Sequence, residues 1–289
     1  MISKYTLHTV MHSFHLPNSH LPNSPIHKFI HTMVKIMILD TETTGLFQIA
    51  GANNKKLDNA IAAKDVETTL GYFQDASWLS KSPYITQMSF IVYDTEKQCI
   101  SQSYNTFIDM DINIKINKMA SKITRIYACI EDAIENGENV FDESLVILSE
   151  IKKKHPQKIK TMEQMMSEFI QALDMCDCIV AHNVSFDIKM LLVEAKRLNN
   201  MFYFKKIFEI KHECTMLQSI DICNLIIYYK SGKSYKKYPK LQEAYERLFH
   251  DLPNNNALHN ALYDTYICLK IYCKLKDWNQ PFEYACIMV

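Results

Sequence analysis

Short apolar runs alternate along this chain with longer segments in which apolar residues recur at every third or fourth position. The short runs predict buried strands at residues 36–39, 84–93, 103–108 and 178–181. The longer segments predict amphipathic helices at residues 161–173, from the turn around 187 to 198, at 240–249 and at 258–273. Strands come first and then alternate with helices, which predicts an α/β layer structure with a mixed sheet.

The clearest of these helices begins at Thr161. Thr161 and Gln164 have the spacing of a capping box, and the methionines that follow recur at helical period. This methionine-rich face predicts packing in the core rather than a cofactor site. Residues 220–229 fit a strand or a helix equally well, and residues 110–160 show no clear pattern.

Two segments interrupt the alternation. Residues 1–32 contain six of the eleven histidines and no acidic residue. They offer little to pack, so they predict a disordered tail in front of a single domain, residues 33–289. Within that domain, residues 48–82 form a long polar insert.

The overall charge is balanced, with 32 basic and 32 acidic residues, so any basic footprint for nucleic acid must be local. One candidate is the stretch 228–240, where lysines alternate with tyrosines. Lys233, Lys236 and Lys237 are its possible contacts to a phosphate backbone, and a solvated loop is the alternative.

The nine cysteines are odd in number and contain no CxxC pair. In a chain of this length, that pattern predicts reduced thiols and therefore an intracellular location, in the cytoplasm or the nucleus. No apolar run approaches the roughly 18 residues that a membrane span requires, so no membrane partner is expected.

The first apolar run ends in two acids, Asp40 and Glu42, separated by one residue. Side chains alternate along a strand, so both carboxylates point the same way. They would repel each other unless a cation lay between them, and hard oxygen ligands suit Mg²⁺ or Mn²⁺. Taken alone, such a pair is also typical of an edge strand that enters a polar turn.

Three further residues could complete a site. Asp187 follows a buried strand and lies in the first turn of the next helix, where an acid also simply stabilises the helix dipole. Asp264 lies beside the apolar stripe of the last helix, where a solvated acid is the alternative. His259 lies at the start of that helix, where a lone histidine is more often a cap or a packed ring.

Taken together, these positions resemble the DEDDh family of 3′–5′ exonucleases, the DnaQ-like group of the RNase H-like superfamily. The family's D-x-E-T-T-G-L motif corresponds to Asp40–Leu46, its V-A-H-N-x-x-F-D motif to Val180–Asp187, and its H-x-A-x-x-D motif to His259–Asp264. The segment Pro239–Gln242 resembles the lead-in to the third motif in viral and phage members. The chain departs from the family at Thr124–Arg125, where many members carry His-Gly.

The resemblance implies an RNase H-like fold, in which helices flank a mixed five-stranded sheet, here with insertions. It implies that two Mg²⁺ or Mn²⁺ ions are held by four acids: Asp40, Glu42, Asp187 and Asp264. His259 would be the general base that takes a proton from the attacking water, without binding metal. Contacts with the terminal nucleotide are implied for Thr41, Thr43, Leu46, Asn183 and Phe186.

The implied function is a metal-dependent 3′–5′ exonuclease that releases nucleoside 5′-monophosphates, in proofreading or end-processing. Single-stranded DNA is favoured as the substrate, and a polymerase is a possible partner. One alternative is an exoribonuclease, since recognition of the 2′-hydroxyl depends on local geometry. An alternative of another class is a non-catalytic nucleic-acid-binding or polymerase-tethering module. The presence of all four acids and the histidine argues against this last alternative.

Overall fold

The computed structural model describes residues 35–47, 51–74, 76–111, 113–254 and 257–281. The predicted tail, residues 1–32, lies outside the described residues.

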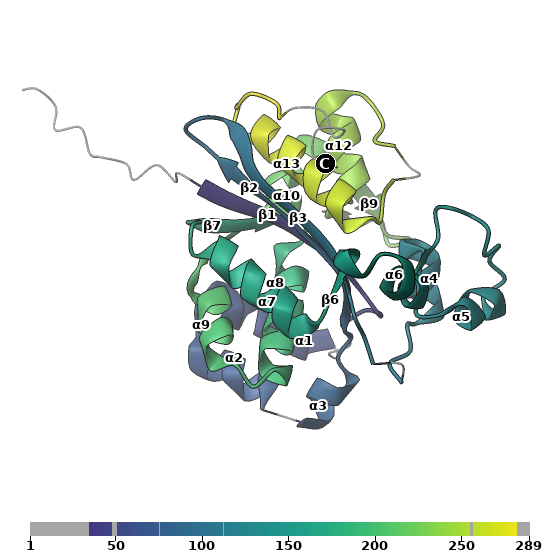
Figure 1. Ribbon diagram of the computed structural model, residues 1–289. Helices are drawn as coiled ribbons and strands as arrows, with labels where there is room; N and C mark the ends of the chain where they lie inside the picture. Colours follow the sequence, from purple (N-terminus) through teal and green to yellow (C-terminus); the bar gives the residue numbers. More distant parts are fainter. Residues whose placement is uncertain (1–34, 48–50, 75, 112, 255–256, 282–289) are drawn as a thin grey trace, which may run out of the picture. The chain divides into compact units, whose positions relative to one another are not determined.

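A mixed six-stranded sheet organises the described part of the chain (Figure 1). In spatial order, its strands are β6 (Ile159–Lys160), β3 (Cys99–Ile108), β2 (Ile85–Asp94), β1 (Lys35–Thr43), β7 (Cys178–Ala181) and β8 (Lys211–Cys214). β1 pairs antiparallel with β2 and parallel with β7, and β2 pairs antiparallel with β3. The predicted RNase H-like α/β fold with a mixed sheet is therefore confirmed.

The sheet has six strands, however, and the prediction of five was wrong. The additional strand is β6, which pairs in parallel with the end of β3 through Phe107 and Ile108. It is two residues long and lies in the segment 110–160, where the hydrophobic pattern did not predict a strand. β8 also had no apolar run, because it begins with the polar residues Lys211, His212 and Glu213 at the sheet edge.

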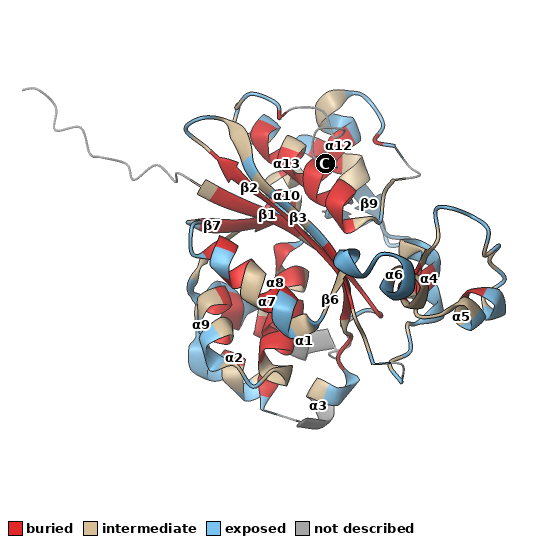
Figure 2. Ribbon diagram, in the orientation of Figure 1, coloured by how far each residue is buried: buried red, intermediate tan, exposed pale blue. Residues whose placement is uncertain are grey.

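Two hydrophobic cores cover the two faces of the sheet, because side chains alternate along β1. Met37 and Leu39 pack into one core, and Ile36 and Ile38 pack into the other. The first core is covered by α7 (Met162–Leu173), α8 (Val184–Arg197) and α9 (Met201–Glu209). The second is covered by α12 (Leu241–Phe249) and α13 (Ala261–Leu275). Figure 2 shows the central strands β1, β2 and β7 and the inner faces of the helices as mainly buried.

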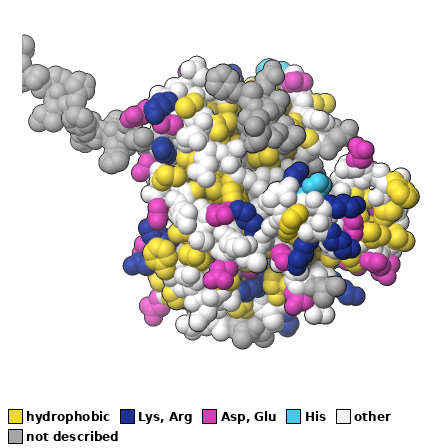
Figure 3. All heavy atoms as spheres, viewed as in Figure 1, with side chains coloured by type: hydrophobic (Ala, Val, Ile, Leu, Met, Phe, Trp, Pro, Cys, Tyr) yellow, Lys and Arg dark blue, Asp and Glu magenta, His cyan; other side chains and the backbone are white. Residues whose placement is uncertain are grey.

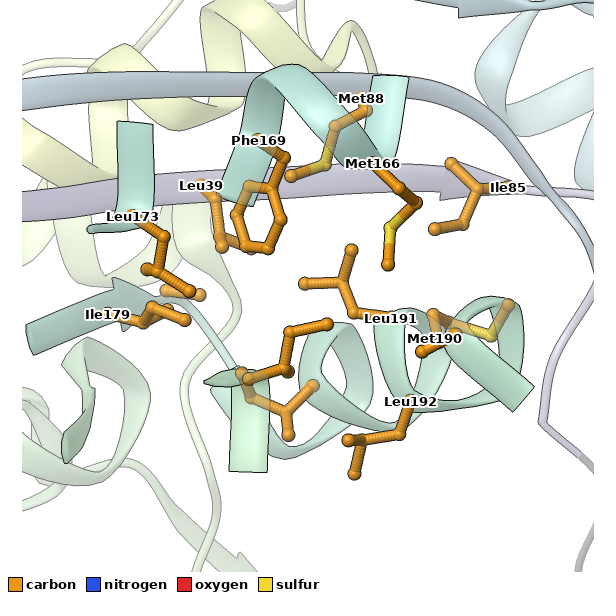
Figure 4. Packing of buried hydrophobic residues seen from close by; sticks show 14 of the residues in the cluster. Leu39, Ile85, Met88, Met166, Phe169, Leu173, Ile179, Met190, Leu191 and Leu192 are labelled. Atoms are coloured by element: carbon orange, nitrogen blue, oxygen red, sulfur yellow. The ribbon is translucent and has the colours of Figure 1, made fainter. Parts of the chain in front are cut away.

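The predicted role of the methionines in α7 is confirmed. Met166 and Phe169 point from α7 towards Leu39 on β1 and Leu191 on α8 (Figure 4), and all four side chains are fully buried. Thr161 caps the helix, and the capping box with Gln164 is present as predicted.

The polar insert 48–82 contains three helices: α1 (Gly51–Ala62), α2 (Val66–Phe73) and α3 (Ala76–Lys81). Leu57, Ile61 and Phe73 are buried in the first core, so these helices are part of the domain's interior. The connection between α1 and α2 is held by Lys64, whose ammonium donates hydrogen bonds of 2.6 Å to two carbonyls at the end of α9.

The patternless segment before α7 forms a small unit with its own apolar clusters. Its elements are α4 (Lys118–Thr124), β4 (Ile126–Tyr127), α5 (Ile130–Glu135), β5 (Val146–Ile147), α6 (Leu148–Lys154) and the 3₁₀ turn Pro156–Lys158. Basic side chains gather over α6 (Figure 3). They are ion-paired there, Lys152 with Asp109 at 2.7 Å and both Lys153 and Lys154 with Glu150.

The ambiguous stretch 220–229 contains both kinds of structure. α10 (Thr215–Gln218) precedes this stretch, which begins with α11 (Ile220–Cys223), and α11 ends where Asn224 adopts a left-handed conformation with φ of 47°. β9 (Ile226–Tyr228) then pairs with β10 (Ser234–Lys236) in a separate two-stranded hairpin.

Within the described residues, every helix is too short or too polar to cross a membrane.

Candidate active site

The carboxyl end of β1 places two acids on the face that α13 covers. Asp40 and Glu42 continue the alternation of Ile36 and Ile38, so their side chains project towards α13. Opposite them on β2 stand Ser89 and Gln87. The predicted common orientation of the two acids therefore follows from the strand's period.

Asp187 reaches the same strand end from the other face. It lies in the first turn of α8, immediately beyond the end of β7. Its Oδ1 accepts hydrogen bonds from the backbone N–H of Thr41 at 3.1 Å and from the Thr41 hydroxyl at 2.8 Å. Thr41 thus joins β1 to α8 and orients the third acid.

Asp264 enters from the first turn of α13, whose N-terminus is held in two ways. Asn260 caps the helix by accepting a hydrogen bond from the N–H of Leu262 at 3.1 Å. The side chain of Gln87 on β2 accepts a hydrogen bond from the N–H of Ala261 at 3.3 Å. This second contact fixes the start of α13 against the strand that lies opposite Glu42.

The four acids meet at the end of β1, because Asp187 is hydrogen-bonded to Thr41 between Asp40 and Glu42, and Glu42 lies beside Asp264. Burial raises the pKa of Asp40 from its ordinary value of 3.8 to about 7. Burial, and then the charge of Asp40, raise the pKa of Glu42, of Asp187 and of Asp264 well above their usual ranges. Asp40 is the common neighbour of the other three, as expected for the centre of a carboxylate cluster.

His259 stands at the solvent side of this cluster. It is exposed, and its backbone has a left-handed φ of 64°, which is unusual for a residue other than glycine. Its N–H donates a hydrogen bond of 3.1 Å to Oδ2 of Asp264. Desolvation, followed by the charge of Lys240, lowers the pKa of the ring, so the imidazole is neutral near pH 7 and able to accept a proton.

The donor set fits a hard divalent cation. Ligand atoms of Glu42, His259 and Asp264 lie within 4.8 Å of one another. Oδ1 of Asp264 is buried and has no hydrogen-bond partner among the described residues, so it is free to bind a cation. Asp40 and Asp187 lie outside this group of three and add their charge to it. The grouping makes His259 a candidate ligand as well as a candidate base, and its exclusion from the metal stays a prediction.

The five residues predicted to contact the nucleotide differ in how open they are. Leu46 is 79% exposed and lines a hollow of about 410 Å³ together with residues 80–84, 113–115 and Asn117. Asn183 is exposed and Phe186 is partly exposed. Thr41 and Thr43 are buried, and the Thr43 hydroxyl donates to the carbonyl of Gly45 at 2.7 Å. Their roles towards a substrate stay predictions.

Of the three lysines predicted to contact a phosphate backbone, two are ion-paired. Lys236 contacts Asp221 at 2.6 Å, and Lys237 contacts Glu243 at 2.5 Å. Lys233 is exposed and has no ion pair among the described residues.

The sequence did not lead us to expect the polar contacts that join α1 of the insert to α8. The buried ammonium of Lys189 contacts Asp58 of α1 at 2.9 Å and donates to Asn54 at 2.8 Å. The hydroxyl of Ser185 also donates to Asp58. Both donors flank Asp187 on α8, so the insert positions the helix that carries this acid. The sequence signal for these contacts was Lys189 itself, a charged residue within the apolar face of a predicted helix.

Gln87 was also missed, although its signal was visible. It interrupts an apolar strand on the face of Glu42, and a polar residue in that position indicates the wall of a site.

An exonuclease family of the RNase T type matches residues 91–272, which is more than half of the chain. The chain belongs to this exonuclease family. The matched range contains Asp187, His259 and Asp264, while Asp40 and Glu42 lie before it on β1.

Solved structures of exonuclease I resemble this chain, at low sequence identity and low TM-score. Escherichia coli exonuclease I in complex with a dA16 oligonucleotide is 12% identical, with a TM-score of 0.45, and the match covers 84% of this chain and 40% of that one. A product-bound exonuclease I is 11% identical, with a TM-score of 0.48, and the match covers 85% and 44%. The chain thus spans less than half the length of these proteins. No curated protein matches its sequence.

Proposed function

We propose that this protein is a metal-dependent 3′–5′ exonuclease that cuts nucleoside 5′-monophosphates from the 3′ end of nucleic acid, with DNA favoured over RNA. Membership of the exonuclease family supports the reaction class. The observation that carries the proposal is the meeting of Asp40, Glu42, Asp187 and Asp264 with His259 at the end of β1.

Four mutually repelling carboxylates are costly to bury unless a cation compensates them. Two Mg²⁺ or Mn²⁺ ions held by these four acids would supply positive charge to the reacting phosphate. Thr41 would keep Asp187 oriented through its two hydrogen bonds. Gln87 would keep Asp264 in place by holding the first turn of α13.

His259 is placed to act as the general base. One of its ring nitrogens lies within 4.8 Å of a carboxylate oxygen of Glu42 and of Asp264, yet the residue is exposed to solvent. Since its pKa is lowered, the neutral ring can take a proton from an attacking water at neutral pH. The exposed side chain of Leu46 would pack against the terminal base, and the open Asn183 would contact its nucleotide.

The test is digestion of 5′-labelled single-stranded DNA, duplex DNA and RNA in parallel, with Mg²⁺, Mn²⁺ or excess chelator. We expect progressive shortening from the 3′ end, release of nucleoside 5′-monophosphates, and no reaction in chelator. Asp40→Asn should abolish the reaction, while Glu163→Gln, an exposed acid on α7, should not change it. Activity that survives chelator or Asp40→Asn would contradict the proposal.

The same assay separates the alternatives. Digestion of RNA without DNA would indicate an exoribonuclease. Tight binding without hydrolysis under any metal condition would indicate a non-catalytic module. Nothing in the described part of the chain or in the comparisons supports a polymerase partner.

A further inference from the structure

The hairpin of β9 and β10 projects an unusual set of side chains into solvent. Its turn closes where Gly232, with φ of 80°, donates its N–H to the carbonyl of Tyr229 at 3.0 Å. Every residue in both strands is exposed. A two-stranded hairpin is only marginally stable alone. Here its base is anchored, because the N–H of Lys237 binds the carbonyl of Leu225 at 2.8 Å and two of its lysines are ion-paired.

Aromatic rings are concentrated on this hairpin, residues 225–240. Pairing places Ile227 opposite Tyr235, and Tyr229 opposite Lys233, so these side chains share one face. The rings of Tyr229 and Tyr235 lie with centroids 5.2 Å apart, and both remain about half exposed, at 57% and 46%. Tyr228 and Tyr238 are exposed as well. Rings left in water on a projecting element indicate a binding surface rather than a core.

The charge of the hairpin is entirely positive. Residues 225–240 contain five lysines and no acid. Lys236 and Lys237 are compensated by acids of neighbouring helices. Lys230 and Lys233, on either side of the turn, have no ion pair among the described residues. Exposed rings beside uncompensated lysines match a single strand, which offers base faces and phosphates together.

The hairpin is continuous with the active site. The carbonyl of Pro239 accepts a hydrogen bond of 3.0 Å from Nε2–H of His182, which stands next to Asn183 at the start of α8. One residue further, Lys240 caps the start of α12, which packs in the same core as α13, the helix that carries Asp264. The base of the hairpin is thus joined to the elements that carry the site, which gives a strand whose 3′ end lies there a neighbouring surface to bind.

We propose that the β9–β10 hairpin binds single-stranded nucleic acid upstream of the terminal nucleotide, with bases stacked on Tyr229 and Tyr235 and phosphates held by Lys230 and Lys233. The proposal deepens the exonuclease function and rests on it for the direction of the strand. It gives the enzyme a preference for long single strands over duplex ends and over short fragments, because only a long unpaired strand reaches both the acids and the rings.

Binding is measured by fluorescence anisotropy in chelator, where hydrolysis does not interfere, with a labelled single strand of about 20 nucleotides. Loss of one stacking ring weakens single-strand binding by about 5- to 150-fold. Because Tyr229→Ala with Tyr235→Ala removes two such rings, we expect its loss to exceed that of either single substitution, by at least about 25-fold in total. The Phe substitutions at both positions should retain the affinity, because they keep the ring faces. A strand of abasic deoxyribose phosphates should bind the wild type and the Ala variant equally weakly.

The lysines are tested by the dependence of affinity on salt. Each phosphate contact on a single strand contributes about −0.7 to the slope of log affinity against log salt. Lys230→Ala with Lys233→Ala should make the slope shallower by about 1.4. The matched control is Lys205→Ala with Lys206→Ala, which removes two charges from α9 on the opposite face of the sheet and should leave the slope unchanged.

A small substrate separates this proposal from the proposed function. All hairpin variants should hydrolyse the p-nitrophenyl ester of thymidine 5′-monophosphate as fast as the wild type, since it is too short to reach the rings. If the wild type hydrolyses strands but the tyrosine and lysine variants bind like it, the hairpin proposal is overturned and the exonuclease stands. If no phosphodiester is hydrolysed yet the variants lose binding, the exonuclease is wrong and the hairpin site stands.

Discussion

Replacing Asp40 by Asn should make the metal-free protein more stable while it abolishes the reaction. Asp40 lies at the centre of four carboxylates, and its charge raises the pKa of the other three. In the absence of a cation, each negative charge in the cluster opposes folding. Asn keeps the size of the side chain and removes the central charge.

The magnitude follows from the pKa of Asp40. Burial raises it from 3.8 to about 7. Since one pKa unit corresponds to about 1.4 kcal/mol, ionised Asp40 costs the folded state up to about 4 kcal/mol above pH 7. The folded pKa lies above the unfolded one, so the folded state binds the extra proton between pH 4 and 7. Stability is therefore lost as the pH rises through this window. Partial solvent access makes about 2–4 kcal/mol a realistic gain for Asp40→Asn at pH about 8.

Urea unfolding in excess chelator measures this gain at several pH values. The free energy of unfolding of Asp40→Asn should exceed that of the wild type above pH 7, and the difference should shrink towards pH 4. Adding Mg²⁺ or Mn²⁺ should reverse the order, because a ligand that binds only the folded state stabilises it. Glu163→Gln on α7 serves as the control and should behave as the wild type. Equal stability of Asp40→Asn and the wild type in chelator at pH 8 would refute the carboxylate cluster.

Three further outcomes are expected. His259→Ala should lower kcat by about 10²–10⁴-fold and leave the apparent metal affinity nearly unchanged. A pH–rate profile and a metal titration measure the two quantities, and a large loss of metal affinity would instead make the histidine a ligand. Asp58→Ala should destabilise the fold by about 1–3 kcal/mol in urea unfolding, because it leaves the buried Lys189 without its ion pair, whereas Asp58→Asn should cost less. His212 should contribute a loss of stability as the pH falls from 6.5 to about 4, opposite in sign to the contribution of Asp40, since burial and the charge of Lys64 lower the pKa of His212 to about 4 and only the unfolded ring binds a proton in that window. The free energy of unfolding of His212→Gln relative to the wild type should therefore rise as the pH falls from 6.5 to about 4, and a difference that does not change with pH would count against this assignment.

The main departures from the sequence-based expectations share one cause. Leu57 and Ile61 are spaced as one face of a helix, but the asparagines and lysines around them concealed it, and α1 is helical because that face packs into the core beside α8. β6 and β8 are short edge strands without apolar runs, and partner strands define them. Local pattern predicts an element only where the element's own residues supply the burial.

The candidate site was predictable to the extent that it is local. The strand period alone places Asp40 and Glu42 on one side of β1, and the sequence pattern places Asp187 in the first turn of its helix. Asp264 was expected further inside the last helix, and it lies in the first turn because α13 begins at Ala261. Neither period nor spacing indicates which residues hold those turns in place. The hydroxyl of Thr41 does so for Asp187 and the side chain of Gln87 for the start of α13, from positions 146 and 174 residues away in the chain.

The sequence by itself thus determined the acids, the histidine, the order of the main strands and helices, and the family to which they point. These properties depend on side-chain chemistry and on periods of two or 3.6 residues, which can be recognised within a short segment of the sequence. The tertiary structure alone decided that the polar insert contacts α8 through Asp58 and Lys189, that β6 extends the sheet, and that the base of a hairpin of tyrosines and lysines contacts His182 before α8. Each of these depends on contacts between segments far apart in the chain, whose free energy is gained only when the whole domain has closed around them.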